Sequence, residues 1–159
     1  MKKEMVLNVN GEQISVSVEP RKTLADTLRD DCALTGTHLG CEHGVCGACT
    51  VLLDDEPVRS CLLFAVQCEG KAIRTVEGLA GTELHPLQKA FSQRHGLQCG
   101  FCTPGFLMLA AWIVEQKDAP DEATLREQLS SNLCRCTGYQ SILAAVKDAM
   151  EAVGGDEGI

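Results

Sequence analysis

Eight of the ten cysteines in this 159-residue chain fall into two groups of four, and groups of four thiolates typically bind metals. The first group has three closely spaced members and a fourth after a spacer: Cys41, Cys46, Cys49 and Cys61. The second group consists of two short pairs that are far apart in the chain: Cys99 with Cys102, and Cys134 with Cys136. Two such groups predict two metal clusters, and a protein with two clusters typically moves electrons.

The first group has the spacing of plant-type [2Fe–2S] ligands, Cys-x4-Cys-x2-Cys followed by a more distant cysteine. Three glycines, Gly40, Gly44 and Gly47, alternate with its ligands. Glycine permits positive φ and close backbone approach, so N–H groups of this loop can point at the sulfurs of an anionic cluster. We therefore expect a loop that wraps one side of a [2Fe–2S] cluster.

The second group is arranged differently, because each of its pairs stands just before an apolar helical run. One pair lies in residues 99–104 and the other in residues 132–139. Two residues of chain reach at most about 7 Å, so Cys134 and Cys136 can grip one metal centre. Helix N-termini favour a nearby anion, so two such loops predict a cluster site at one end of a set of helices.

Disulfides and structural zinc are the alternatives for these cysteines. No apolar run follows Lys2 and Lys3, so we expect no signal peptide and a cytoplasmic protein with reduced thiols. The first spacing is not a common zinc pattern, whereas spacing alone leaves zinc open for the second group. Cys32 and Cys68 lie outside both groups and are expected in the core.

The rest of the composition excludes several functions. The net charge is −8 and the basic residues are scattered, which argues against nucleic acid as a partner. The longest apolar run, residues 106–114, is shorter than the roughly 20 residues that span a bilayer, so no membrane span is expected. No Ser/His/Asp set or paired carboxylates stand out, so we predict no catalytic residue.

The periodicity of the sequence changes near residue 78, which predicts an α+β fold in two parts. Asn10-Gly11 joins two β-prone runs into a hairpin, and Thr23 is a candidate N-cap of one helix. Strands are expected at residues 50–53, 58–60 and 72–76, and four helices after residue 84. The expected units are residues 1–78, an all-α part over residues 79–153, and a disordered tail over residues 154–159.

Three motifs resemble one known family, the iron–sulfur subunit of the xanthine oxidase family of molybdenum hydroxylases. They are Gly40–Val51, Gln98–Gly105 and Cys134–Tyr139, and they occur in the family's order. The resemblance extends from the first hairpin to the last helix, and no cysteine ligand is missing. It is closest to the separate small subunit of the multi-chain members.

This resemblance implies a fold and a role for each cysteine group. An N-terminal β-grasp, ferredoxin-like domain would hold the [2Fe–2S] cluster nearer the flavin on the first group. An all-α four-helix bundle would hold the [2Fe–2S] cluster nearer molybdenum on the second group, which favours iron over zinc there. Gln98 and Cys136 fall on the positions that contact molybdopterin.

The implied function is electron transfer from molybdenum on a large subunit to FAD on a medium subunit. The molybdopterin would be the cytosine dinucleotide form, and the complex a dimer of heterotrimers. A free-standing two-cluster ferredoxin is the alternative, although such a carrier has no need of Gln98 or the helical part. A zinc-stapled interaction module without redox activity is the third reading.

Overall fold

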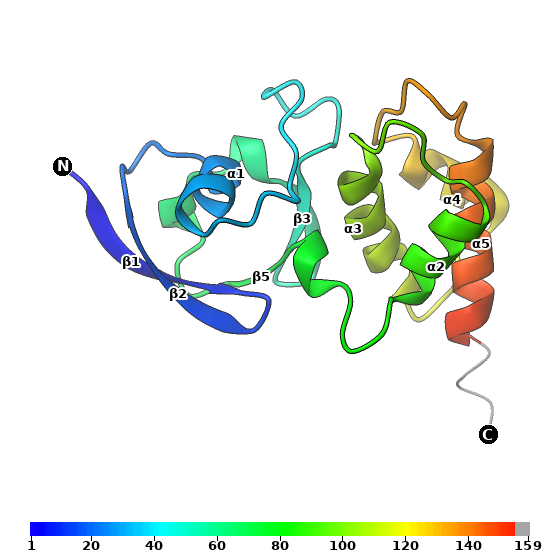
Figure 1. Ribbon diagram of the computed structural model, residues 1–159, viewed down its shortest axis with the longest axis horizontal. Helices are drawn as coiled ribbons and strands as arrows, with labels where there is room; N and C mark the ends of the chain where they lie inside the picture. The colour runs from blue at the N-terminus through cyan, green and yellow to red at the C-terminus, as the bar shows by residue number, and fades with distance from the viewer. Residues whose placement is uncertain (155–159) are drawn as a thin grey trace.

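The computed structural model describes residues 1–154, with strands in the first half and helices in the second (Figure 1). Strands β1 (Lys3–Val9) and β2 (Glu12–Val18) form the predicted antiparallel hairpin. Asn10 and Gly11 at its turn both have positive φ, 53° and 83°, as a two-residue primed turn requires. Alternate residues of both strands are buried, so one face of the hairpin covers the core.

Three further strands complete a five-stranded sheet in the order β2-β1-β5-β3-β4. They are β3 (Thr50–Leu53), β4 (Glu56–Arg59) and β5 (Ala72–Arg74), and β5 runs parallel to β1. Strand β5 is shorter than predicted because the N–H of Thr75 donates to the Asn10 side chain instead, at 2.8 Å, and a 3₁₀ turn follows.

The short helix α1 (Leu24–Asp26) continues as a π-helical turn over Thr27–Asp31. Thr23 caps it as predicted, since its hydroxyl accepts the N–H of Asp26 at 3.1 Å. Leu24 and Leu28 pack in the same core as the inward side chains of the sheet. One helical segment therefore covers this core, and the loop to β3 begins where it ends.

The second half contains the helices α2 (Pro86–Gln93), α3 (Thr103–Val114), α4 (Glu122–Leu129) and α5 (Gln140–Gly154). His85 caps α2 and Asp121 caps α4, each accepting a backbone N–H of the first turn. Helix α5 includes Gly154, one residue beyond the expected end, as is common at helix termini. The rest of the expected tail, residues 155–159, lies outside the described residues.

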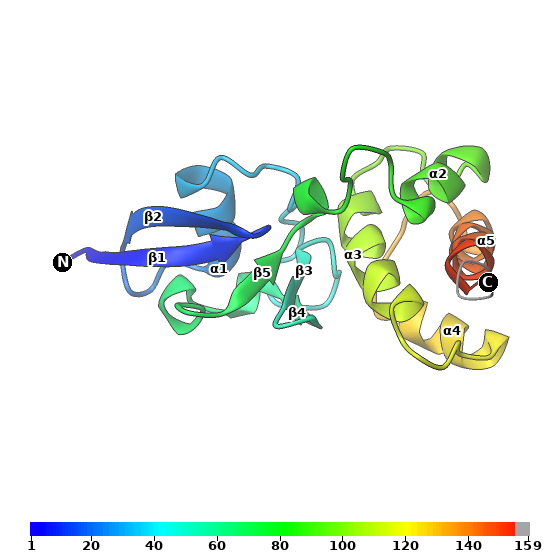
Figure 2. The same cartoon turned by 90° about the horizontal axis from the view of Figure 1, so that it is seen from below.

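Helix α3 stands between the sheet and the other three helices (Figure 2). Residues 105–111 are all buried, because this helix meets neighbours on nearly every side. At its far end, the guanidinium of Arg74 on β5 donates to both carboxylate oxygens of Glu115, at 2.9 and 2.7 Å. No helix within residues 1–154 is long and apolar enough to cross a membrane.

The two halves pack tightly at Gly105, in the first turn of α3. A Cβ added there would lie 2.2 Å from the carbonyl oxygen of Gly47 and 3.0 Å from Cα of Ala48. Both are backbone atoms of the first cysteine loop, so they cannot rotate away. The start of α3 thus fits against the loop only because residue 105 has no side chain.

Gly105→Ala should therefore destabilise the protein by about 1–3 kcal/mol, the usual range for overpacking. Alanine is otherwise favoured over glycine inside a helix, so the sign of the change tests the close contact. Thermal and urea unfolding of the variant would measure it. Gly81→Ala is the control, because no atom lies within 4 Å of its added Cβ. A stabilised Gly105→Ala protein would contradict the close approach.

Candidate metal centres

The first cysteine group is assembled by the β3–β4 hairpin. Cys49 immediately precedes β3 and Cys61 follows β4 in a 3₁₀ turn. Thr50 pairs with Arg59 at the base of this hairpin, which brings the two cysteines together. Both are buried, against Ala25 and Leu39. Cys41 and Cys46 lie in the loop before β3 and are partly exposed.

The second group is assembled by two loops that precede helices. Cys102 stands at the N-cap of α3, with Cys99 three residues earlier. Cys134 and Cys136 lie in the loop before α5. The sulfurs of Cys136 and Cys99 are 3.5 Å apart, so the loop before α5 contacts the loop before α3. The structure thus brings the two loops of this predicted site into contact at Cys99 and Cys136.

The eight cysteines form four close pairs. In each pair one thiol shifts the pKa of its neighbour: Cys41 with Cys46, Cys49 with Cys61, Cys99 with Cys136, and Cys102 with Cys134. Each iron of a [2Fe–2S] cluster takes two thiolates, whereas zinc takes four around one point. This donor set fits two-iron clusters better than zinc.

Glycine shapes the first loop where a side chain could not fit. Gly44 and Gly47 both have positive φ, 87° and 72°. A Cβ added to Gly44 would lie 2.5 Å from the Leu62 side chain. A Cβ added to Gly47 would lie 2.0 Å from the Asn132 side chain. Backbone N–H groups of the loops also point at sulfur, as from Cys46 to Cys41 at 3.4 Å. The loop can therefore surround a cluster with backbone donors.

Burial and hydrogen bonding shift the pKa values of individual thiols in opposite directions. Hydrogen bonds from the backbone N–H groups of Cys46 and His43 lower the pKa of Cys41 to about 6. Burial raises the pKa of Cys61 to about 12, and the neighbouring Cys49 thiol adds to this. Burial likewise raises the pKa of Cys102 to about 12. Positive charge from bound iron would be needed to ionise the buried members.

Exposure differs between the two groups. In the second group Cys99 and Cys136 are both exposed, and Cys102 and Cys134 are partly buried. Gln98, next to Cys99, is also exposed. One thiol pair of the second group therefore lies at the surface together with Gln98, while the first group has its buried pair, Cys49 and Cys61, in the interior.

The two cysteine loops touch each other, a contact that the sequence analysis did not predict. His38 stacks on Phe101 with ring centroids 5.0 Å apart, and its Nδ1 lies 2.7 Å from the Phe101 carbonyl oxygen. Arg59 and Asn132 also bridge the loops through hydrogen bonds. These contacts join residues that are distant in the chain, and no local pattern reveals them. Cys32 and Cys68 pack with the sheet core, as predicted.

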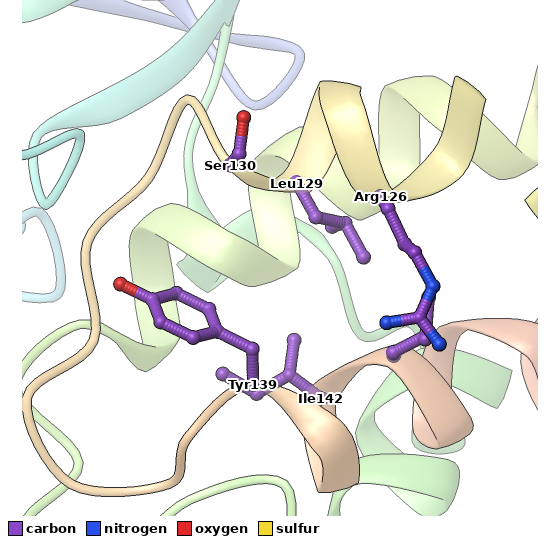
Figure 3. Close-up of a pocket in the computed structure, with 6 residues that line it drawn as sticks. Arg126, Leu129, Ser130, Tyr139 and Ile142 are labelled. Carbon is purple, nitrogen blue, oxygen red and sulfur yellow. The ribbon is translucent and has the colours of Figure 1, made fainter. Parts of the chain in front are cut away.

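A cavity of about 310 Å³ lies between α4 and the start of α5 (Figure 3). Its floor is largely apolar, formed by Leu129, Ile142 and Leu143. The hydroxyl of Ser130 donates to the carbonyl of Glu127 at 2.6 Å, and no lining residue is a histidine or carboxylate that could activate it. This cavity therefore lacks the groups of a hydrolytic site.

Comparison with known proteins identifies both halves. Residues 7–80 match the "2Fe-2S iron-sulfur cluster binding domain", and residues 75–147 match the "[2Fe-2S] binding domain". The chain is 55% identical to the nicotine 6-hydroxylase small subunit of Paenarthrobacter nicotinovorans, over 98% of this chain and 94% of that one. It is 57% identical to the caffeine dehydrogenase subunit gamma of Pseudomonas sp. (strain CBB1), over 89% and 87%.

A solved structure is similarly close. The crystal structure of quinoline 2-oxidoreductase from Pseudomonas putida 86 contains a chain that is 48% identical to this one. The two superpose with a TM-score of 0.92 over 98% of each chain. The fold described above therefore matches that chain along almost its whole length.

The pairing of thiols predicts what single substitutions remove. Cys61→Ser should abolish one cluster and Cys102→Ser the other, each lowering the iron content from about four to about two per chain. Iron analysis and the spectra of the reduced clusters would show which one survives. Cys32→Ser, outside both groups, should keep all the iron. Zinc in the native protein, or a full iron content in Cys61→Ser, would contradict this ligand assignment.

Proposed function

Since this chain belongs to the iron–sulfur small subunits of the xanthine oxidase family of molybdenum hydroxylases, we propose how its two centres serve the electron transfer of such an enzyme. The chain carries electrons within an oxidoreductase and does not itself transform substrate. When bound, a [2Fe–2S] cluster accepts and donates one electron at a time. The chain's own residues hold the clusters, shield them and set their surroundings.

The observation that carries the proposal is the exposed group formed by Gln98, Cys99 and Cys136. A thiol pair at the surface lets electrons enter from a partner without crossing a layer of protein, and the 3.5 Å sulfur contact keeps the pair together. An exposed amide beside it can donate and accept hydrogen bonds at a pterin edge. This surface suits contact with molybdopterin on a large subunit.

In this proposal the second cysteine group receives electrons and the first passes them to FAD on a medium subunit. Exposed apolar side chains beside the first group, Val45, Leu62 and Phe64, suit contact with such a partner. The pterin would carry cytosine dinucleotide, and two heterotrimers would form the complex, in the cytoplasm. Nicotine, caffeine and quinoline appear in the names of related proteins. These compounds and an aldehyde are therefore the first substrates to test.

The two cysteine groups also divide the chain into two proposed units. Residues 1–78 contain one hydrophobic core, beneath the sheet. Residues 79–153 supply most of the side chains of a second core, around α3. We propose that the first is a β-grasp unit and the second a four-helix bundle. A free-standing ferredoxin is less favoured, because the helical unit presents its ligands at the surface beside Gln98.

Purification of the tagged full chain from its native host tests this function directly. We expect about four irons per chain, with molybdenum, flavin and two larger polypeptides in constant ratio. Metal analysis, flavin fluorescence and mass spectrometry of the polypeptides would establish the composition. Iron without a stoichiometric partner would instead favour the free-standing carrier.

Gln98→Leu tests the pterin contact separately. Loss of one hydrogen bond should slow reduction of the clusters by substrate about three- to tenfold, while both clusters remain. Stopped-flow absorbance of the whole complex would measure this rate. Gln93→Leu, a matched change of an exposed glutamine at the end of α2, should leave it unchanged. An unchanged rate in Gln98→Leu would remove Gln98 from the electron entry site.

A further inference from the structure

A backbone hydrogen bond joins the two cysteine loops. The N–H of Leu133 donates to the carbonyl oxygen of Cys46 at 2.9 Å. Cys46 belongs to the first cysteine group, and Leu133 directly precedes Cys134 of the second. The connection between these two ligands therefore consists of one hydrogen bond and a short run of covalent bonds. In Figure 1 the two loops, cyan and orange, both lie on the upper side of the molecule.

Arg59, at the end of β4, holds this connection from one side. Its Nη2 donates to the carbonyl oxygen of Ser131 at 2.7 Å, and its Nε donates to that of Gly44 at 3.4 Å. Its Nη1 donates to the hydroxyl of Thr50, in β3. One guanidinium thus contacts both cysteine loops and the strand next to Cys49. A rigid fork of donors can do this, whereas the single ammonium of lysine cannot match the geometry.

Asn132 holds the connection from the other side. It is only 1% exposed, and its Nδ2 donates to the carbonyl oxygen of Gly47 at 3.3 Å. Its Oδ1 has no hydrogen-bond partner among the described residues, which is an unfavourable state for a buried amide. An apolar side chain would avoid that cost but could not donate to Gly47. The contact with the first loop is thus the one polar interaction that the amide makes in this buried position.

We propose that Arg59 and Asn132 are positioning residues that together hold segment 131–133 on the first cysteine loop and so set the rate of electron transfer between the two clusters. This inference rests on the proposed function, since it takes both cysteine groups as cluster ligands. The two residues, called the clamp below, touch neither reacting atoms nor any cysteine sulfur in the contacts described. They act by keeping the Leu133–Cys46 hydrogen bond closed, and with it the separation of the clusters.

The test compares Arg59→Lys, Arg59→Gln and Asn132→Ala in the purified complex. Lysine keeps the charge but loses the fork, and glutamine loses both, so the pair separates geometry from charge. Three quantities are measured: the magnetic interaction between the two reduced clusters, amide exchange of the peptide containing Leu133, and the rate of transfer between clusters. Arg21→Gln is the control, since Arg21 is 87% exposed and pairs only with Glu19 among the described residues.

We expect all three clamp variants to keep their iron, to show a weaker magnetic interaction and faster exchange at Leu133, and to transfer electrons about tenfold more slowly. The control should match the native complex. Normal magnetic interaction and normal amide exchange in iron-loaded variants would overturn the proposal. So would native behaviour of Arg59→Lys together with altered behaviour of Arg59→Gln, because that result would indicate that only the charge of Arg59 matters.

If the Arg59 variants lose the first cluster, Asn132→Ala decides the question. The Gly47 carbonyl would still accept two hydrogen bonds from Thr50 in that variant, so the first loop keeps its own contacts. A normal magnetic interaction and normal exchange there would overturn the clamp. Failure of the proposed function is distinguishable from both results, because the native complex would then lack one or both cluster signals.

Discussion

The close approach of backbone around Gly47 is the constraint on which the rest of the arrangement depends. Gly47 is buried, has positive φ, and meets both the start of α3 at Gly105 and the side chain of Asn132. A Cβ at either glycine would separate the first cysteine loop from the helical half. The separation would also open the hydrogen bond from Leu133 to Cys46, so the absence of two side chains determines how near the cysteine groups lie.

Burial then gives the two groups different surroundings. The interior pair Cys49 and Cys61 sits behind the β3–β4 hairpin, where water is excluded and charges interact strongly. The exposed pair Cys99 and Cys136 lies in a more polar environment at the ends of loops. Because burial, hydrogen bonds to sulfur and solvent access all influence reduction potential, the fold can make two chemically identical clusters unequal. Unequal potentials give electron flow a direction.

Local signals in the sequence predicted the local parts of this structure. Asn10-Gly11 predicted the hairpin turn, and Thr23 predicted the N-cap of α1. A proline marked the first turn of α2 and of α3. Cysteine spacing predicted which residues belong to each group. Spacing did not reveal which thiols pair, since Cys49 meets Cys61 only after β3 and β4 have joined. The contacts of Arg59 and Asn132 were equally hidden, because they depend on the docking of two halves and not on any periodic pattern.

The arginines of this acidic chain show how such docking is stabilised. Arg74, Arg94 and Arg126 pair with carboxylates at the surface, where solvent screening leaves each pair only weakly stabilising. Arg29 and Arg59 donate to backbone carbonyls instead. Arg29 holds those of Thr35 and Thr37, just before Cys41, and Arg59 holds those of Gly44 and Ser131. A carbonyl leaves the cationic charge uncancelled, so these two arginines can order the cysteine loops and offset the negative charge of clusters within them.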